Sequence, residues 1–150
     1  MNELELWAAR WGIPREAIAE LIGAIPDNPK APGGTEARVQ ADLRLMAPAI
    51  GVLLWRNNRG SAVGPNGQMV RFGLANDSPQ VNRRVKSSDL IGIGADGRFV
   101  SVEVKKPGWT YRGTPEEEAQ LAWIRLVQAH GGRAGFANCV TQLPEILGYV

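Results

Sequence analysis

The sequence contains very little of the chemistry on which many enzymes depend. Its single cysteine, Cys139, excludes an internal disulfide framework and a cysteine-rich zinc site. Its single histidine, His130, excludes a metal site built on two histidines and nucleases that use paired histidines. Any hydrolytic metal centre must therefore be held by carboxylates, whose hard oxygen atoms favour Mg²⁺ or Mn²⁺ over Zn²⁺.

Long hydrophobic segments are also missing from the chain. No apolar run approaches the roughly 20 residues that cross a bilayer, and the N-terminus carries acids where a secretory signal has a basic region. Together with the single cysteine, these features predict a cytoplasmic protein with no membrane partner. At 150 residues, the chain is long enough to form one good hydrophobic core.

The net charge of +2 is unevenly distributed along the sequence. Residues 1–50 and 114–150 each carry a net charge of −2, whereas residues 51–113 hold ten basic and four acidic residues, a net charge of +6. A basic segment is what neutralisation of nucleic-acid phosphates requires, although a solvated basic surface without a ligand explains the charge equally well. The candidate phosphate contacts are Arg56, Asn58, Arg59, Arg83, Arg84, Lys86 and Lys106.

The chain divides into two predicted parts, 1–34 and 35–150. The first part has two short helices, at about 4–11 and 14–24, and then a linker rich in proline and glycine at 26–34. We interpret it as a helical appendage that packs on the rest of the protein. A small helix-turn-helix-like element is the weaker alternative.

The second part alternates strands and helices. Thr35 is expected to cap a helix from Glu36 to about Ala47, and Thr114 a helix that opens with a capping box and ends near His130. Residues 75–88 are expected to be irregular. This order predicts an α/β domain whose mixed sheet is covered by helices. The predicted strands are 51–57, 69–74, 90–94, 98–106 and 133–140, and a short helix at 143–147 closes the chain.

The clearest hairpin joins the extended runs 90–94 and 98–106. A two-residue turn between them would leave Asp89 on the face opposite Glu103. A three-residue turn that ends in a left-handed Gly97 would instead pair Asp89 directly with Glu103. We predict the three-residue turn, because its third position favours glycine.

Polar residues on this hairpin are hard to explain by packing. Asp89 precedes an apolar run, and Glu103 and Lys105 interrupt a strand of valines. Alternate residues share a face, so the Glu103 and Lys105 side chains stand roughly 7 Å apart on one side of the strand. Burying them is costly unless they are paired. A surface salt bridge is the alternative, since so short a pattern also arises by chance.

Two carboxylates and a lysine are what metal-dependent phosphodiester hydrolysis needs. Carboxylates hold a divalent cation, which polarises the phosphate and activates a bound water, and a lysine stabilises the charge that develops. Two further polar residues, Glu36 and Gln120, stand on the apolar stripes of their helices and need partners there. A shared polar centre would supply partners for both, although separate local hydrogen bonds would also do so.

Glu36, Ser87-Ser88-Asp89, Glu103-Val104-Lys105 and Gln120 together resemble the PD-(D/E)XK restriction-endonuclease-like superfamily. More narrowly, the sequence resembles the VRR-NUC family in the compact stand-alone form found in phages and bacteria. The similarity covers about Thr35 to Val140, and EVKKPG with the downstream glutamine is its most specific part. The proline that precedes the aspartate in the superfamily is replaced here by serine, a departure that we discount because that proline holds no metal.

The resemblance implies a restriction-endonuclease-like fold and a Mg²⁺- or Mn²⁺-dependent DNA endonuclease that leaves a 5′-phosphate. Small VRR-NUC proteins resemble structure-selective nucleases and are often homodimers, which suits branched or junction DNA. A catalytically silent nucleic-acid-binding module with the same fold is the main alternative. A structural or partner-binding phage protein is a third possibility.

The resemblance also implies a role for each site residue. Asp89, Glu103 and the Val104 carbonyl would be metal ligands, and Glu36 would join through water or a second ion. Lys105 would act on the nucleophilic water, and Gln120 would orient that water or the lysine.

Aromatic residues near the site have two interpretations. Trp109 and Tyr111 stand beside Lys106 and Arg112 in the sequence, where they are placed to stack on an unpaired base. Packing of Trp109 against the edge of the sheet is the other interpretation.

Overall fold

The computed structural model describes residues 3–24 and 34–149, so most of the predicted linker lies outside the described residues. The described strands are β1 (Leu53–Arg56), β2 (Gly60–Val63), β3 (Met69–Phe72), β4 (Leu90–Ile93), β5 (Phe99–Val104) and β6 (Arg133–Ala137). The helices are α1 (Glu3–Trp11), α2 (Arg15–Ala24), α3 (Glu36–Met46), α4 (Pro79–Arg84), α5 (Pro115–Ala129) and α6 (Leu143–Ile146), with short 3₁₀ helices η1 (Ala47–Ile50) and η2 (Val140–Gln142).

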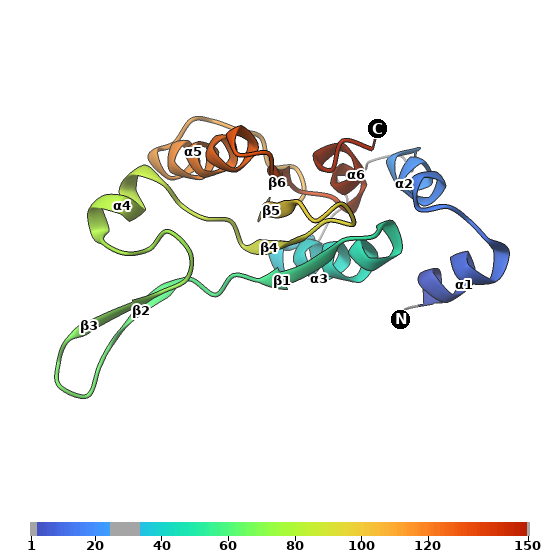
Figure 1. The fold of residues 1–150 in the computed structure, drawn as a ribbon. Helices are drawn as coiled ribbons and strands as arrows, with labels where there is room; N and C mark the ends of the chain where they lie inside the picture. The colour runs from blue at the N-terminus through green and yellow to red at the C-terminus, as the bar shows by residue number, and fades with distance from the viewer. Residues whose placement is uncertain (1–2, 25–33, 150) are drawn as a thin grey trace.

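Four of the strands form one mixed sheet in the order β1-β4-β5-β6 (Figure 1). The β1–β4 and β4–β5 pairs are antiparallel, and the β5–β6 pair is parallel because α5 carries the chain back across the sheet. The predicted α/β class with a mixed sheet and flanking helices is confirmed. Thr35 and Thr114 cap α3 and α5 with their side chains, as the sequence predicts.

The β4–β5 hairpin has the predicted three-residue turn. Its register pairs Leu90 with Val102 and Ile93 with Phe99. The Gly94 N–H donates to the Arg98 carbonyl at 2.9 Å, and Gly97 has a φ of 80°, the left-handed conformation that this turn needs. Continued by one residue, the register sets Asp89 opposite Glu103.

The two faces of β5 meet different surroundings. Val100, Val102 and Val104 are at most 2% exposed and belong to a hydrophobic core that also contains Val39 and Leu43 of α3. The alternate residues of the strand face α5, which covers the other side of the sheet (Figure 1). The alternation in the sequence therefore separates a core face from a partly polar face.

The two N-terminal helices form close to their predicted bounds and take part in the main core. Ala8 of α1 and Ile18, Ala19 and Ile22 of α2 are buried in the same hydrophobic cluster as Leu43. Within the described residues, no helix is both long enough and apolar enough to pass through a bilayer.

A second hairpin, β2–β3, projects from the body of the protein (Figure 1). The sequence predicts no strand between residues 57 and 69, which is wrong, because Gly60–Val63 forms one. Its glycine, serine and alanine have low strand propensity, so the strand depends on its pairing with Met69–Phe72.

The expectation of an irregular segment at 75–88 is also partly wrong, because α4 forms there. The Ser78 hydroxyl accepts from the Val81 N–H at 3.2 Å, and Pro79 occupies the first turn. The serine–proline pair was a helix-start signal that the sequence analysis missed.

Candidate metal centre

Polar residues gather at one end of the four-stranded sheet. Arg56 at the end of β1 pairs with Leu90 at the start of β4, and Val104 at the end of β5 pairs with Ala137 at the end of β6. Segments that are distant in the sequence therefore meet at a single edge. The residues that flank these strand ends build the candidate site.

Asp89 and Glu103 face each other at this edge. Half-buried Asp89 accepts a hydrogen bond through Oδ2 from the Val104 backbone N–H at 3.0 Å. Glu103 is only 3% exposed, and its Oε1 accepts from Gln120 Nε2 at 2.7 Å. Its other oxygen, Oε2, is buried and has no hydrogen-bond partner among the described residues. An ionised carboxylate left in this state is costly, so Glu103 needs a proton or a cation.

The electrostatics of the Asp89–Glu103 pair also indicate that Glu103 needs a proton or a cation. Burial raises the pKa of Glu103 from its ordinary value of 4.5 to about 8, and the negative charge of Asp89 adds to the rise. A protonated Glu103 could donate to the adjacent Asp89 carboxyl, which also raises the pKa of Glu103, whereas the charges of Lys105 and Arg59 lower it. At neutral pH the two carboxyls therefore hold a proton unless another positive charge replaces it.

Gln120 connects the carboxyl pair to Lys105. This glutamine is 4% exposed, which confirms its predicted place on the buried face of its helix. Its Oε1 accepts from Lys105 Nζ at 2.8 Å while its Nε2 donates to Glu103. Lys105 Nζ also lies 3.9 Å from Glu103 Oε1. One amide on α5 thus fixes the side chain of Glu103 on β5 and that of Lys105, which directly follows the strand.

Asn57 and Arg59 hold the segment that carries Asp89. The Asn57 side chain donates to the Ser87 hydroxyl at 2.8 Å and to the Ser88 carbonyl at 2.9 Å, and its backbone N–H donates to the Asp89 carbonyl. Arg59 Nη1 donates to the Ser87 carbonyl at 2.8 Å. Sequence spacing does not predict these roles of Asn57 and Ser87, because the contacts join segments that are distant along the chain.

The predicted phosphate contacts differ in their surroundings. Arg59 is engaged with the backbone before Asp89, and Lys86 Nζ lies 3.4 Å from a carboxylate oxygen of Glu116. The others have exposed side chains, and they are Arg56, Asn58, Arg83, Arg84 and Lys106.

Glu36 does not occupy the buried position that the sequence predicts. It is exposed, because α3 begins at this residue and buries its apolar stripe only from Val39 onward. Among the residues that the structure describes, no three histidine, cysteine, aspartate or glutamate side chains are grouped so as to hold a metal ion. The acidic part of the site is therefore the Asp89–Glu103 pair.

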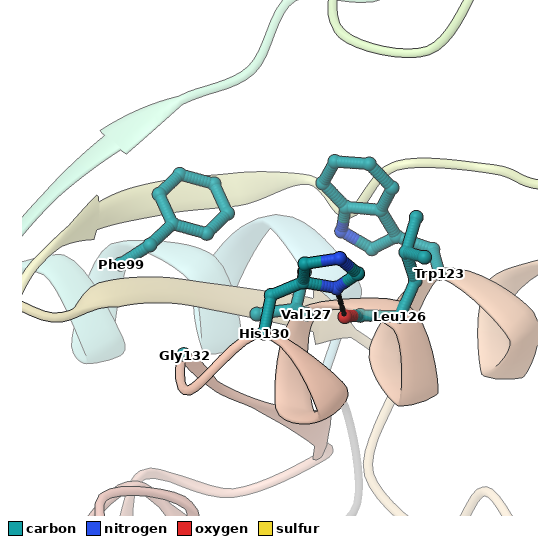
Figure 2. Close-up of a pocket in the computed structure, with 6 residues that line it drawn as sticks. All are labelled: Phe99, Trp123, Leu126, Val127, His130 and Gly132. Atoms are coloured by element: carbon teal, nitrogen blue, oxygen red, sulfur yellow. Dashed lines mark hydrogen bonds between the residues drawn. The ribbon is translucent and has the colours of Figure 1, made fainter.

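An apolar pocket of about 350 Å³ lies farther along the same face, between the start of β5 and the C-terminal half of α5 (Figure 2). Trp123 Nε1 donates to the Ser101 hydroxyl at 2.8 Å, and the Phe99 and Trp123 rings meet edge to face at 6.4 Å. His130 closes one side, with its Nδ1 2.8 Å from the Leu126 carbonyl. This pocket contains none of the predicted site residues.

Comparison with protein-family models, with curated proteins and with solved structures finds no match to this chain. The resemblance to VRR-NUC nucleases therefore rests on the quoted residues alone. What supports a function is the geometry of the site itself.

Proposed function

We propose that this protein is a metal-dependent DNA endonuclease with a restriction-endonuclease-like fold of the VRR-NUC kind. The observation that carries the proposal is the Asp89–Glu103 pair, in which a buried oxygen of Glu103 finds no hydrogen-bond partner in the part of the chain that the structure describes. A lysine, held by Gln120, stands directly beside that pair.

The chemistry of the pair fits a divalent cation. Two carboxylates that repel one another, one of them with a pKa raised to about 8, gain stability from any cation placed between them. Their hard oxygens favour Mg²⁺ or Mn²⁺, with the Val104 carbonyl as the proposed third ligand. Because only two carboxylates meet here, water and substrate phosphate would complete the shell. A bound cation would polarise the phosphate and lower the pKa of a coordinated water.

The protein's own residues supply the rest of the chemistry. Lys105 donates hydrogen bonds to the attacking water and to the phosphate oxygens as charge develops on them. Gln120 holds the Lys105 ammonium in place, so that little reorganisation is needed during the reaction. Arg59 and Asn57 fix the segment before Asp89 and thereby set the position of its carboxylate.

A cleavage assay tests the proposal directly. The protein is incubated with end-labelled linear and branched DNAs in Mg²⁺, Mn²⁺ or EDTA, with Glu103→Gln as the matched inactive variant. We expect cuts that leave 5′-phosphates in the presence of metal, more of them on branched DNA, and none in EDTA or with the variant. DNA binding without cleavage under every condition would contradict the proposal and favour a silent binding module.

A further inference from the structure

Three aromatic rings gather beside Lys105. Trp109 and Tyr111 lie in the segment between β5 and α5, and Phe136 lies on β6. The Trp109 and Phe136 centroids are 4.9 Å apart, and Tyr111 is 6.0 Å from Phe136 and 6.4 Å from Trp109. Lys105 Nζ stands 5.4 Å from the centre of the Trp109 ring and 5.8 Å from that of Phe136. The rings and the proposed catalytic lysine therefore form one continuous surface.

The segment that carries Trp109 and Tyr111 is firmly anchored. Glu117, 7% exposed in the first turn of α5, accepts backbone N–H groups of Arg112 at 2.7 Å and Gly113 at 3.0 Å. The indole N–H of Trp109 lies 3.4 Å from the other Glu117 oxygen, and Asn138 Nδ2 donates to the Trp109 carbonyl at 3.2 Å. The predicted capping box is thus modified. The Thr114 hydroxyl accepts from the Glu117 N–H, but the Glu117 carboxylate accepts from the two residues that precede Thr114. Rings held in this way lose little entropy when a ligand binds.

Packing explains only part of this arrangement. Trp109 is half-buried and packs against Phe136 of β6, but Tyr111 is 42% exposed, and its hydroxyl donates to Glu118 at 3.2 Å. The exposed residues Lys106 and Arg112 flank the two aromatic residues in the sequence, and the carboxylates of Glu117 and Glu118 on α5 bind the polar atoms of the two rings. An exposed tyrosine next to a half-buried tryptophan and the Lys105 ammonium is a combination that binds unpaired nucleotides, in which each base offers a ring face and each phosphate a charge.

We propose that Trp109 and Tyr111 form a stacking platform for an unpaired nucleobase next to Lys105. This inference rests on the proposed function and names its substrate class, DNA with unpaired nucleotides beside the cleaved bond. Bases inside a duplex are already stacked on one another, so the platform discriminates against fully paired DNA. The expected preference is on the order of tenfold.

Binding in EDTA tests the platform without requiring cleavage. Fluorescence anisotropy compares a labelled blunt duplex with the same duplex bearing a single-stranded tail, for the parent, Tyr111→Ala, Tyr111→Phe and Trp11→Ala. Trp11 is an exposed aromatic on α1 and serves as the matched control. We expect the parent, Tyr111→Phe and Trp11→Ala to prefer the tailed DNA by about tenfold, and Tyr111→Ala to lose that preference. Thermal unfolding of each variant confirms that it is folded.

A second readout reports stacking itself. A 2-aminopurine base in the tail loses fluorescence when it stacks on an aromatic ring, so the parent should quench it and Tyr111→Ala should not. Equal binding of the two DNAs by the parent, or a preference that survives in Tyr111→Ala, would overturn the platform even if the protein cuts DNA. A tail preference that depends on Tyr111 in a protein that never cuts would support the platform and overturn the nuclease proposal alone.

Discussion

The face between β5 and α5 has two ends that are built from the same strand and helix but hold different chemistry. At the apolar end, the Phe99 and Trp123 rings pack together (Figure 2), and the one polar atom of the indole has its partner in Ser101. At the other end, Glu103 and Gln120 are buried, and one oxygen of Glu103 has no hydrogen-bond partner within residues 3–24 and 34–149.

Packing of β5 against α5 therefore does not explain why polar side chains are buried at this end. The apolar end shows that this strand and helix can meet through aromatic contacts with their polar atoms satisfied. A buried carboxylate with a raised pKa, by contrast, lowers the stability of the folded protein at neutral pH. Residues that break local packing rules in this way are expected at functional sites.

The largest contrast between the two ends is expected in the cleavage rate. Lys105→Ala should lower the rate by about 100- to 1,000-fold, because the ammonium stabilises the transition state more than the ground state. Folding and most DNA binding should remain. Trp123→Phe, at the apolar end, should lose one hydrogen bond, about 1 kcal/mol of stability, and no activity. Single-turnover kinetics and thermal unfolding measure both variants, and an unchanged rate in Lys105→Ala would remove it from the mechanism.

A second contrast concerns pH. The unfolded chain releases the Glu103 proton near the ordinary pKa of 4.5, whereas the folded protein keeps it up to about pH 8. Between these values the folded state binds more protons, so this residue's contribution to stability falls as the pH rises.

Glu103→Gln removes that titration and serves as the comparison. In EDTA, the thermal midpoint of Glu103→Gln relative to the parent should rise steadily from about pH 5 to about pH 8. A difference that stays constant over this range would mean that Glu103 is already ionised in the folded protein, against our account of the site.

A smaller effect on the cleavage rate is expected from Gln120, whose side-chain amide connects α5 to Glu103 and Lys105. Gln120→Met keeps the length of the side chain but frees Lys105 and removes the donor to Glu103 Oε1, so the rate should fall about ten- to a hundredfold and the thermal midpoint should fall as well. Gln128→Met is the control, because Gln128 lies on the same helix and donates to the Ala134 carbonyl away from the site. Equal rates for the two variants would show that Gln120 has only a packing role.

The smallest effect is expected from single phosphate contacts. Arg83→Ala and Arg84→Ala on α4 should each weaken DNA binding and reduce the log–log salt slope by about one. Arg10→Ala, an exposed arginine in the acidic N-terminal region, should leave the slope unchanged. The measurement is a salt titration of binding by anisotropy, and a flat response in the parent would count against nucleic acid as the ligand.

Local patterns in the sequence were enough to predict the elements that present the site. The alternation of β5 and the glycine of its turn predict the register that sets Asp89 opposite Glu103, because each depends on neighbouring residues only. The apolar stripe of α5 likewise predicts that Gln120 is buried.

Features that depend on distant contacts could not be predicted in the same way. Asn57 and Arg59 lie about thirty residues from the segment that they hold, and no periodicity connects them. Glu36 was misplaced because an apolar stripe does not show where a helix starts to meet its neighbours. The residues of Gly60–Val63 have low strand propensity, so this strand depends on its pairing with Met69–Phe72.

The central claim is that Asp89 and Glu103 together bind a divalent cation, and thermal unfolding with and without metal tests it most directly. The cation replaces the proton that the carboxyl pair otherwise holds at neutral pH and binds only the folded state, so millimolar Mn²⁺ or Mg²⁺ should raise the thermal midpoint of the parent. Asp89→Asn should lose this response, and without metal it should be at least as stable as the parent. A full metal-dependent rise in Asp89→Asn, or none in the parent, would contradict the claim.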